Sequence, residues 1–185
     1  MANDLEHVQS GNVQVMNPYS GGAVSPSAEA NVMQAAAEQR AMAEVQANML
    51  MAQRFPRDER TCVDRIITSF SRRSLAEAAT YQYARGGQDI TGPSIRAAEA
   101  IAQQWGNFDF GFRELSRMRG ADRVSVSQVQ AYAIDVQNRT RRSIEFHVRH
   151  WRDTRQGGYA LSDERDIYEL VANQAQRRVR SCILA

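Results

Sequence analysis

The chain has 185 residues, of which 43% are hydrophobic and 24% are charged, and its formal net charge is +2. This length and composition are typical of one globular domain with an appendage. No apolar run approaches the roughly 20 residues of a membrane span, and no basic segment followed by an apolar one begins the chain. We therefore expect a cytoplasmic protein that makes no contact with a membrane.

The net charge hides an uneven distribution of charged residues. Residues 1–53 contain five acids and one base, Arg40, so the remainder of the chain is net basic by about six. Arginine replaces lysine throughout, since the chain contains no lysine. A guanidinium binds phosphate through two hydrogen bonds and stacks on bases, but a GC-rich genome would favour arginine as well. The placement of the arginines must therefore decide between these two explanations.

The first part of the chain is predicted to be an arm. Residues 1–26 are rich in Asn, Gln, Ser and Gly, and this composition buries too little apolar surface to order a segment by itself. From Ser27 to about Gln53 the chain is rich in Ala and Met, with a thin apolar stripe at helical spacing. We predict that residues 1–53 form a helical arm that makes oligomer contacts, and that residues 54–185 form the core.

Two helices are predicted between residues 56 and 86. Pro56 favours the start of the first helix, which runs to about Ser71. Its predicted buried face consists of Val63, Ile66, Ile67 and Phe70. Ser74 and Glu77 have the spacing of a capping box, and they predict a second helix that continues through Tyr81 until Gly86-Gly87 ends it.

A third helix is predicted from Gly92-Pro93 to Gly106-Asn107, and after it the spacing of apolar residues changes to alternation. The buried side of this helix consists of Ile95, Ala98, Ala102 and Trp105. The alternating residues that follow are Phe108, Phe110 and Phe112, then Val124 and Val126, then Tyr132, Ile134 and Val136, and finally Ile144, Phe146 and Val148. Gly120 and Asn138 mark turns, and Val129 breaks the middle alternation, which suggests a bulge or a change of register.

These patterns predict an α+β fold. It consists of an antiparallel β-meander of about three strands with one polar face, flanked by helices, and an N-terminal helical arm.

A last helix follows a loop through Gly157-Gly158. Ser162 can cap it, acids occupy its first turn and arginines its last, which the helix dipole favours. Its predicted core side consists of Ile167, Leu170, Val171, Ala175, Val179 and Cys182. Another side is predicted to carry Asn173, Gln176, Arg177 and Arg180, which are spaced i, i+3, i+4 and i+7.

The arginines of the meander cluster around its turns. They are Arg113, Arg117, Arg119 and Arg123 at the first turn, Arg139, Arg141 and Arg142 at the second, and Arg149, Arg152 and Arg155 after the third strand. Trp151, Tyr132 and Tyr159 could offer faces on which bases stack. Turns are usually exposed and aromatic side chains equally suit a core, so a solvated rim and a nucleic-acid surface both stay open.

Residues that could carry catalysis or hold a metal are few. His147 and His150 point to opposite faces of a regular strand, so they cannot hold one metal ion together. Cys62 and Cys182 lie in apolar helical patterns and are predicted to be buried free thiols. A phosphate-binding loop of the Walker type is excluded because its lysine is absent. We expect no catalytic residue, no metal and no cofactor, and hence a binding protein.

The core resembles the phage and plasmid single-strand annealing recombinases, a superfamily that includes RecT, Red-beta, Erf and the eukaryotic Rad-type annealing protein. The resemblance covers about residues 54–185. It rests on the helix from Gly92 to Asn107 (GPSIRAAEAIAQQWGN), on the strand meander, and on the helix that begins at Asp166 (DIYELVANQAQRRVRS).

The resemblance implies binding of single-stranded DNA without ATP, in a groove between the sheet and the helices. It also implies rings or helical filaments of the protein in a bacterial host cell. Arg177 and Arg180 resemble the i, i+3 basic pair with which Rad-type relatives contact the DNA backbone, and Arg85 resembles their basic residue beside a Gly-rich turn. The predicted DNA-binding set is Arg85, Arg96, Arg113, Arg139, Arg141, Arg142, Arg149, Arg152, Asn173, Arg177, Arg178 and Arg180.

The predicted function is therefore ATP-independent binding of single-stranded DNA and annealing of complementary strands in homologous recombination by a homo-oligomer. Its partners would be single-stranded DNA, the annealed duplex and a host single-strand-binding protein. A self-assembling structural or nucleocapsid-like protein that coats nucleic acid is the alternative, because of the Ala- and Met-rich arm. A small enzyme with a site that the sequence hides is a third reading.

Overall fold

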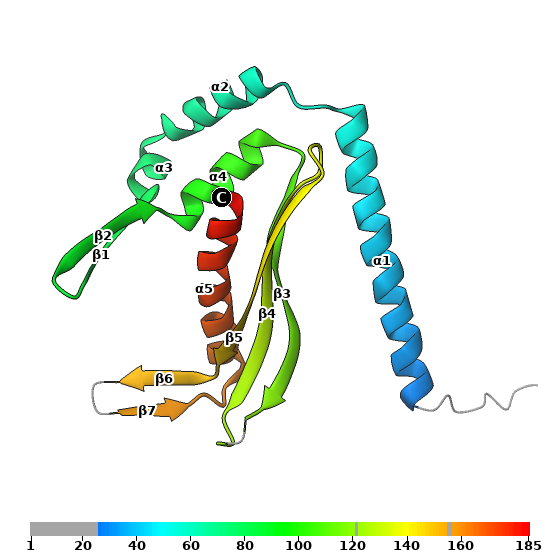
Figure 1. Cartoon of the computed structure of the whole chain (residues 1–185), viewed down its shortest axis with the longest axis vertical. Helices are drawn as coiled ribbons and strands as arrows, with labels where there is room; N and C mark the ends of the chain where they lie inside the picture. The colour runs from blue at the N-terminus through cyan, green and yellow to red at the C-terminus, as the bar shows by residue number, and fades with distance from the viewer. Residues whose placement is uncertain (1–25, 121, 155–156) are drawn as a thin grey trace, which may run out of the picture. The chain divides into compact units, whose positions relative to one another are not determined.

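The computed structural model describes residues 26–120, 122–154 and 157–185, and it confirms an α+β fold (Figure 1). The chain divides into two units, Met1–Ala43 and Glu44–Ala185. Most of the predicted arm over residues 1–26 lies outside the described residues.

Helix α1 (Pro26–Arg54) confirms the helix predicted over residues 27–53. Its residues before Glu44 belong to the smaller unit, where Val32, Met33 and Met42 are exposed. Within the larger unit Ala52 is buried. The large apolar side chains of α1 before Glu44 are thus exposed on the smaller unit taken by itself.

Helix α2 (Glu59–Phe70) starts later than predicted, because Asp58 rather than Pro56 sets its first turn. The Asp58 carboxylate accepts a hydrogen bond from the Thr61 backbone N–H at 3.4 Å. The predicted buried face is only partly right: Ile66 and Phe70 are half-buried, Val63 and Ile67 are exposed, and the buried residues are Cys62 and Ser69. The Cys62 thiol lies 3.1 Å from the carbonyl oxygen of Trp105, which turns the Cys62 side of the helix toward α4 (Ile95–Trp105).

The helix predicted from Ser74 through Tyr81 to Gly86 is confirmed at its start and is wrong from Thr80 onward. Helix α3 spans only Arg73–Ala78, and the chain then forms an antiparallel hairpin of β1 (Thr80–Arg85) and β2 (Gln88–Pro93). Gly86 and Gly87 have φ angles of +61° and +80°, and a two-residue hairpin turn with positive φ at both positions suits glycine. Gly92 and Pro93 therefore lie in a strand, and Ser94 caps α4 by accepting a hydrogen bond from the Ala97 N–H at 3.2 Å.

The predicted meander is confirmed as a three-stranded sheet in the order β3 (Phe108–Arg119), β4 (Ser125–Asp135) and β5 (Thr140–Arg149). The buried face of β4, however, carries Val129, Ala131 and Ala133, whereas Tyr132 and Ile134 lie on the opposite face. The register shifts in β3 between Glu114 and Ser116, next to the residue opposite Val129. Val129 thus belongs to the buried alternation, and the irregularity lies in the neighbouring strand.

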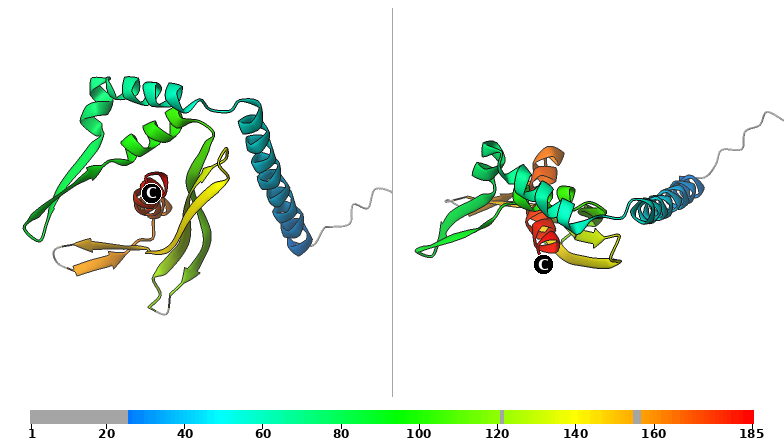
Figure 2. Two further views of the ribbon diagram at one scale, coloured as in Figure 1. Left: turned by 45° about the horizontal axis from the view of Figure 1, so that its top comes forward. Right: turned by 90° about the horizontal axis from the view of Figure 1, so that it is seen from above.

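The segment predicted as a loop through Gly157-Gly158 is a second hairpin. It consists of β6 (Trp151–Thr154) and β7 (Gly157–Ala160). In Figures 1 and 2 both hairpins project on the side of α5 (Glu164–Ile183) that faces away from the three-stranded sheet. Helix α5 thus has the sheet on one side and both hairpins on the other, and β1–β2 lies beside its C-terminal half.

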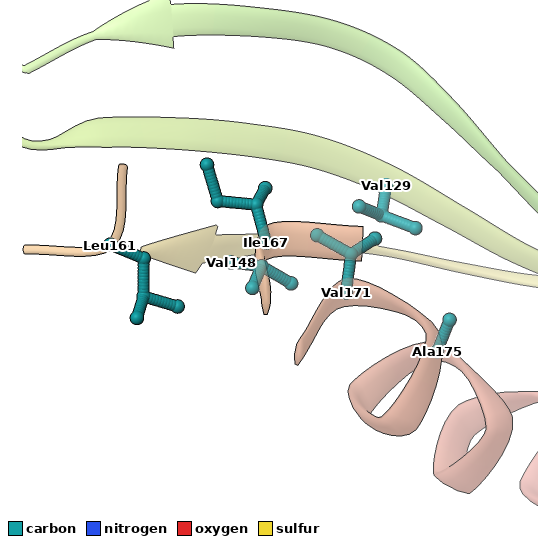
Figure 3. Packing of buried hydrophobic residues seen from close by; sticks show 6 residues of the cluster. All are labelled: Val129, Val148, Leu161, Ile167, Val171 and Ala175. Carbon is teal, nitrogen blue, oxygen red and sulfur yellow. The ribbon is translucent and has the colours of Figure 1, made fainter. Parts of the chain in front are cut away.

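Helix α5 covers the buried face of the sheet. Asp163, not Ser162, caps it, because its carboxylate accepts from the N–H groups of Arg165 and Asp166 at 2.9 and 3.2 Å. The core between helix and sheet consists of Val129, Val148, Leu161, Ile167, Val171 and Ala175 (Figure 3). The predicted core side of α5 is confirmed, with Leu170 half-buried. Cys62 and Cys182 are buried free thiols, as predicted.

Candidate nucleic-acid interface

A groove of about 690 Å³ lies between strand β1, the start of α4 and the outer side of α5. Its lining residues are Tyr81, Gln82, Tyr83, Ser94, Ile95, Asn173, Gln176, Arg177 and Arg180. None of these described residues is acidic, and two are arginines. The groove therefore carries positive charge from two arginines and is bordered by two aromatic rings.

Helix α5 contributes the polar side of this groove. Asn173, Gln176 and Arg177 are exposed and Arg180 is half-buried, while Val171, Ala175 and Val179 of the same helix are buried against the sheet. The helical repeat thus separates the two sets, and the predicted side of α5 does line one surface. Among the described residues Arg177 forms no ion pair, so its guanidinium is available to an anion.

Strand β1 contributes the aromatic side. Tyr81 and Tyr83 are two residues apart on one strand, so their side chains share a face. Their rings stack with centroids 5.9 Å apart and planes 24° apart. The Arg180 guanidinium lies 4.6 Å from the centroid of the Tyr81 ring, and its Nη1 donates to the Pro93 carbonyl oxygen at 3.4 Å. We name this arrangement the Arg180–Tyr81–Tyr83 stack.

Gly92 makes room for the stack. It lies opposite Tyr81 in the hairpin, and a Cβ atom at this position would come within 2.7 Å of the Tyr81 hydroxyl oxygen. A side chain there would therefore displace the tyrosine. Sequence reasoning missed Tyr81 and Tyr83 because it placed them in a helix, although their alternation before Gly86-Gly87 is typical of a hairpin strand.

A second group of predicted residues lies on the sheet face opposite α5. The Arg113 guanidinium lies 5.1 Å from the Tyr132 ring centroid, and Arg141 donates to the Gln130 side chain at 3.2 Å. Arg149 lies 4.6 Å from the Trp151 ring and forms an ion pair of 2.6 Å with Asp122. These groups are separate from the groove, and the carboxylate of Asp122 already neutralises Arg149.

Three of the remaining predicted arginines do not join either surface. Arg178 packs its guanidinium 3.9 Å from the Phe146 ring on the helix side of the sheet, where Arg142 also lies. Arg152 is opposite Tyr159 in the second hairpin and lies 3.6 Å from the Asp166 carboxylate.

Three further arginines lie elsewhere in the fold. Arg139 lies in the β4–β5 turn, with a φ of +58°. Arg96 is exposed in the first turn of α4. Arg85 ends β1 at the hairpin tip, and its side chain lies outside the described part of the structure. The predicted set therefore does not form one continuous basic surface.

A buried polar cluster joins the sheet to the start of α5. The Ser127 hydroxyl donates to the Glu114 carboxylate at 2.6 Å and lies 2.6 Å from Nε2 of His150. Arg117 binds Glu114 at 3.0 Å and Glu164 at 2.7 Å. Burial lowers the pKa of His150, and the hydrogen bond from Arg117 lowers the pKa of Glu114.

This cluster does not have the order of a nucleophilic triad. Serine lies between the acid and the histidine, whereas the hydrolytic arrangement requires histidine between the other two. Ser127 and His150 are also fully buried, so a substrate cannot reach the hydroxyl. The cluster gives hydrogen-bond partners to the buried Ser127 hydroxyl and to Nε2 of His150, whereas Nδ1 of His150 is buried without a partner among the described residues. It was not predicted, because its members are far apart in the sequence.

Over the described ranges of the chain, no group of three His, Cys, Asp or Glu side chains could hold a metal ion. No helix in the same ranges is long and apolar enough to cross a membrane.

Comparison with protein-family models, with curated proteins and with solved structures found no match to this chain. The candidate site is therefore defined by its geometry alone.

Proposed function

We propose that the protein binds single-stranded DNA in the groove between β1 and α5 and anneals complementary strands without ATP, as an oligomer in homologous recombination. The observation that supports this most directly is that Arg177 and Arg180 line the same groove as the stacked rings of Tyr81 and Tyr83. Cations that neutralise phosphates beside aromatic rings that receive bases are the two features of single-strand binding sites.

The chemistry of the groove favours a single strand over a duplex. An aromatic ring stacks on a base only when the base has left its own stack, and bases in a duplex have both faces covered. Asn173, Gln176 and Gln82 add amide groups that can bind sugar or base edges. Phosphate contact from α5 and base contact from β1 would hold one strand between them, with room for a complementary strand to pair.

The resemblance to the annealing recombinases rests on the order of elements in the chain. The three-stranded meander is followed by the β6–β7 hairpin and then by a helix whose outer side presents Arg177 and Arg180. The resemblance adds the remaining parts of the proposal, namely the annealed duplex as product, assembly into rings or filaments, and a host single-strand-binding protein as partner.

Binding to a fluorescent oligonucleotide at increasing salt concentration tests the proposal. If each protomer neutralises about four phosphates, the logarithm of the affinity falls with the logarithm of the salt concentration at a slope near −3. Annealing of complementary oligonucleotides is measured in parallel, without ATP. A flat salt response, or equal affinity for single strands and duplex, contradicts the proposal.

A second candidate function is a self-assembling protein that coats nucleic acid. The exposed apolar residues of α1, among them Val32, Met33 and Met42, favour it because they suit contacts between copies. Negative-stain imaging with and without single-stranded DNA, combined with the annealing assay, separates the two. Assemblies that form without DNA and never accelerate annealing support the coat protein.

A further inference from the structure

We infer that Tyr83 is the residue on which one nucleobase of the bound strand stacks, so that the base extends the Arg180–Tyr81–Tyr83 stack. This inference rests on the proposed function, because it specifies how the groove binds single-stranded DNA. It assigns a base-binding role to a residue for which sequence reasoning predicted only a helix.

The order of the stack follows from the hairpin. Arg180 donates to the carbonyl oxygen of Pro93, which pairs with Thr80 at the base of the hairpin. Tyr83 lies two residues beyond Tyr81 toward the tip. Arg180 and Tyr83 therefore flank Tyr81 from opposite directions along the strand. The half-buried Tyr81 ring thus has a neighbour in both directions, whereas Tyr83 ends the stack.

Tyr83 has an accessible ring. Tyr83 is 48% exposed, and among the described residues Tyr81 is the one aromatic ring that stacks on it. A planar group stacked on Tyr83 would remove apolar ring surface from water and continue an arrangement that the protein has already ordered. Because the Tyr83 side chain is already ordered, binding of the ligand loses little of its conformational entropy.

A nucleobase fits this position better than an apolar side chain. The groove that Tyr83 borders also contains Arg177 and three side-chain amides, and these suit phosphate, sugar and base edges rather than an apolar partner. Stacking uses the face of a base and leaves its Watson–Crick edge free. A base held by Tyr83 therefore remains able to pair, which annealing requires.

Replacing Tyr83 with leucine tests the inference against strands with and without bases. Tyr83→Leu is expected to weaken binding of a single-stranded oligonucleotide about ten-fold, and Tyr83→Phe to bind within about two-fold of the unchanged protein. An abasic strand of the same length is expected to bind the unchanged protein and Tyr83→Leu equally. Tyr168→Leu, at an exposed tyrosine of α5 outside the groove, is the matched control and is expected to bind normally.

Two results overturn the inference. One is equal affinity of Tyr83→Leu and the unchanged protein for the base-containing strand. The other is a loss that is the same with the abasic strand, which would mean that Tyr83 supports the hairpin rather than a base. Failure of the proposed function is distinguishable, since it would remove salt-sensitive binding of every strand, abasic or not. Thermal melting of each variant confirms that the fold is intact.

Discussion

The guanidinium of Arg57 lies 2.5 Å from the carboxylate of Asp135, and the two side chains are only 2% and 9% exposed. The same guanidinium donates to the carbonyl oxygen of Gly106 at 3.1 Å and lies 4.7 Å from the Trp105 ring. Asp135 in turn accepts two hydrogen bonds from Asn138, at 2.9 and 3.0 Å. One ion pair thus joins the segment before α2, the end of α4 and the end of β4.

Removing Arg57 is expected to destabilise the core strongly. Arg57→Ala leaves the Asp135 carboxylate buried without its cation, and breaking a buried pair in this way costs about 3–5 kcal/mol. Chemical denaturation followed by circular dichroism measures the loss. Arg73→Ala, which removes an exposed arginine paired with Glu77, is the control and is expected to change stability by less than about 1 kcal/mol.

The double variant Arg57→Leu with Asp135→Asn provides the second check. Removing both charges while an amide oxygen still accepts from Asn138 is expected to cost less than the sum of the single changes. Additive losses would mean that the two groups do not depend on each other.

Local sequence patterns predicted those parts of the fold in which the repeat of a single helix or strand decides which side chains are buried. The two sides of α5 follow from its helical repeat, so the Val171 side and the Arg177 side were both predictable. In β4 the prediction chose the wrong face because Tyr132 and Ile134 are more hydrophobic than Ala131 and Ala133. The small residues lie under α5, where a helix and a strand pack closely.

The rest depends on contacts between distant residues. Tyr81 and Tyr83 could have been assigned to a hairpin from their alternation, but Ser74 and Glu77 gave a competing helical signal. Arg180 reaches Tyr81 from the last helix, and Arg57 pairs with Asp135 across 78 residues of sequence. No local pattern indicates such pairs. The aromatic side of the groove and the Arg57–Asp135 ion pair could therefore be identified only from the three-dimensional structure.

His150 is expected to make stability depend on pH. Burial lowers its pKa, so the unfolded chain binds a proton more readily than the folded protein. Stability therefore falls as the pH drops below about 6.5, by at most about 1.4 kcal/mol per pH unit. Arg117, Glu114 and Glu164 face this histidine; Glu114, whose pKa is also lowered, adds to the loss only at more acidic pH.

His150→Gln isolates this effect. The glutamine amide can still donate to Ser127 but cannot take up a proton. Thermal melting at pH 7.5 and pH 5.5 is expected to differ for the unchanged protein and to be nearly the same for the variant. The reading is wrong if both proteins lose the same stability between these two pH values.

The two arginines of the groove are expected to behave differently. Arg177 is exposed, so Arg177→Ala should weaken single-strand binding by about 1.5–3 kcal/mol with unchanged melting. Arg180 also packs on Tyr81 and binds Pro93, so Arg180→Ala should lower both affinity and melting temperature. Arg165→Ala, at an exposed arginine near the other end of α5, is the control and should bind normally. Normal affinity in Arg177→Ala would exclude Arg177 as a phosphate contact, and normal affinity in both variants would exclude the outer side of α5.

The N-terminal segment is expected to serve assembly rather than DNA binding. Residues 1–53 are net acidic and repel phosphate, whereas the rest of the chain is net basic, so the basic part of a second copy is the partner that the charges favour. Val32, Met33 and Met42 are exposed and would be covered in such a contact. A long helix with a thin apolar stripe gains most of its stability from packing of this kind.

Deleting residues 1–43 tests this division while keeping the buried Ala52 of the larger unit. The truncated protein is expected to form smaller oligomers by light scattering and to anneal more slowly, because linked sites on one strand are lost. Its salt-sensitive binding to a short oligonucleotide should persist. Met33→Gln with Met42→Gln should shrink the oligomer in the full chain, whereas Gln39→Ala, an exposed change on the same helix, should not. If the truncated protein assembles to full size, the contacts between copies lie within residues 44–185, and the exposed edges of the three-stranded sheet are then the next place to search.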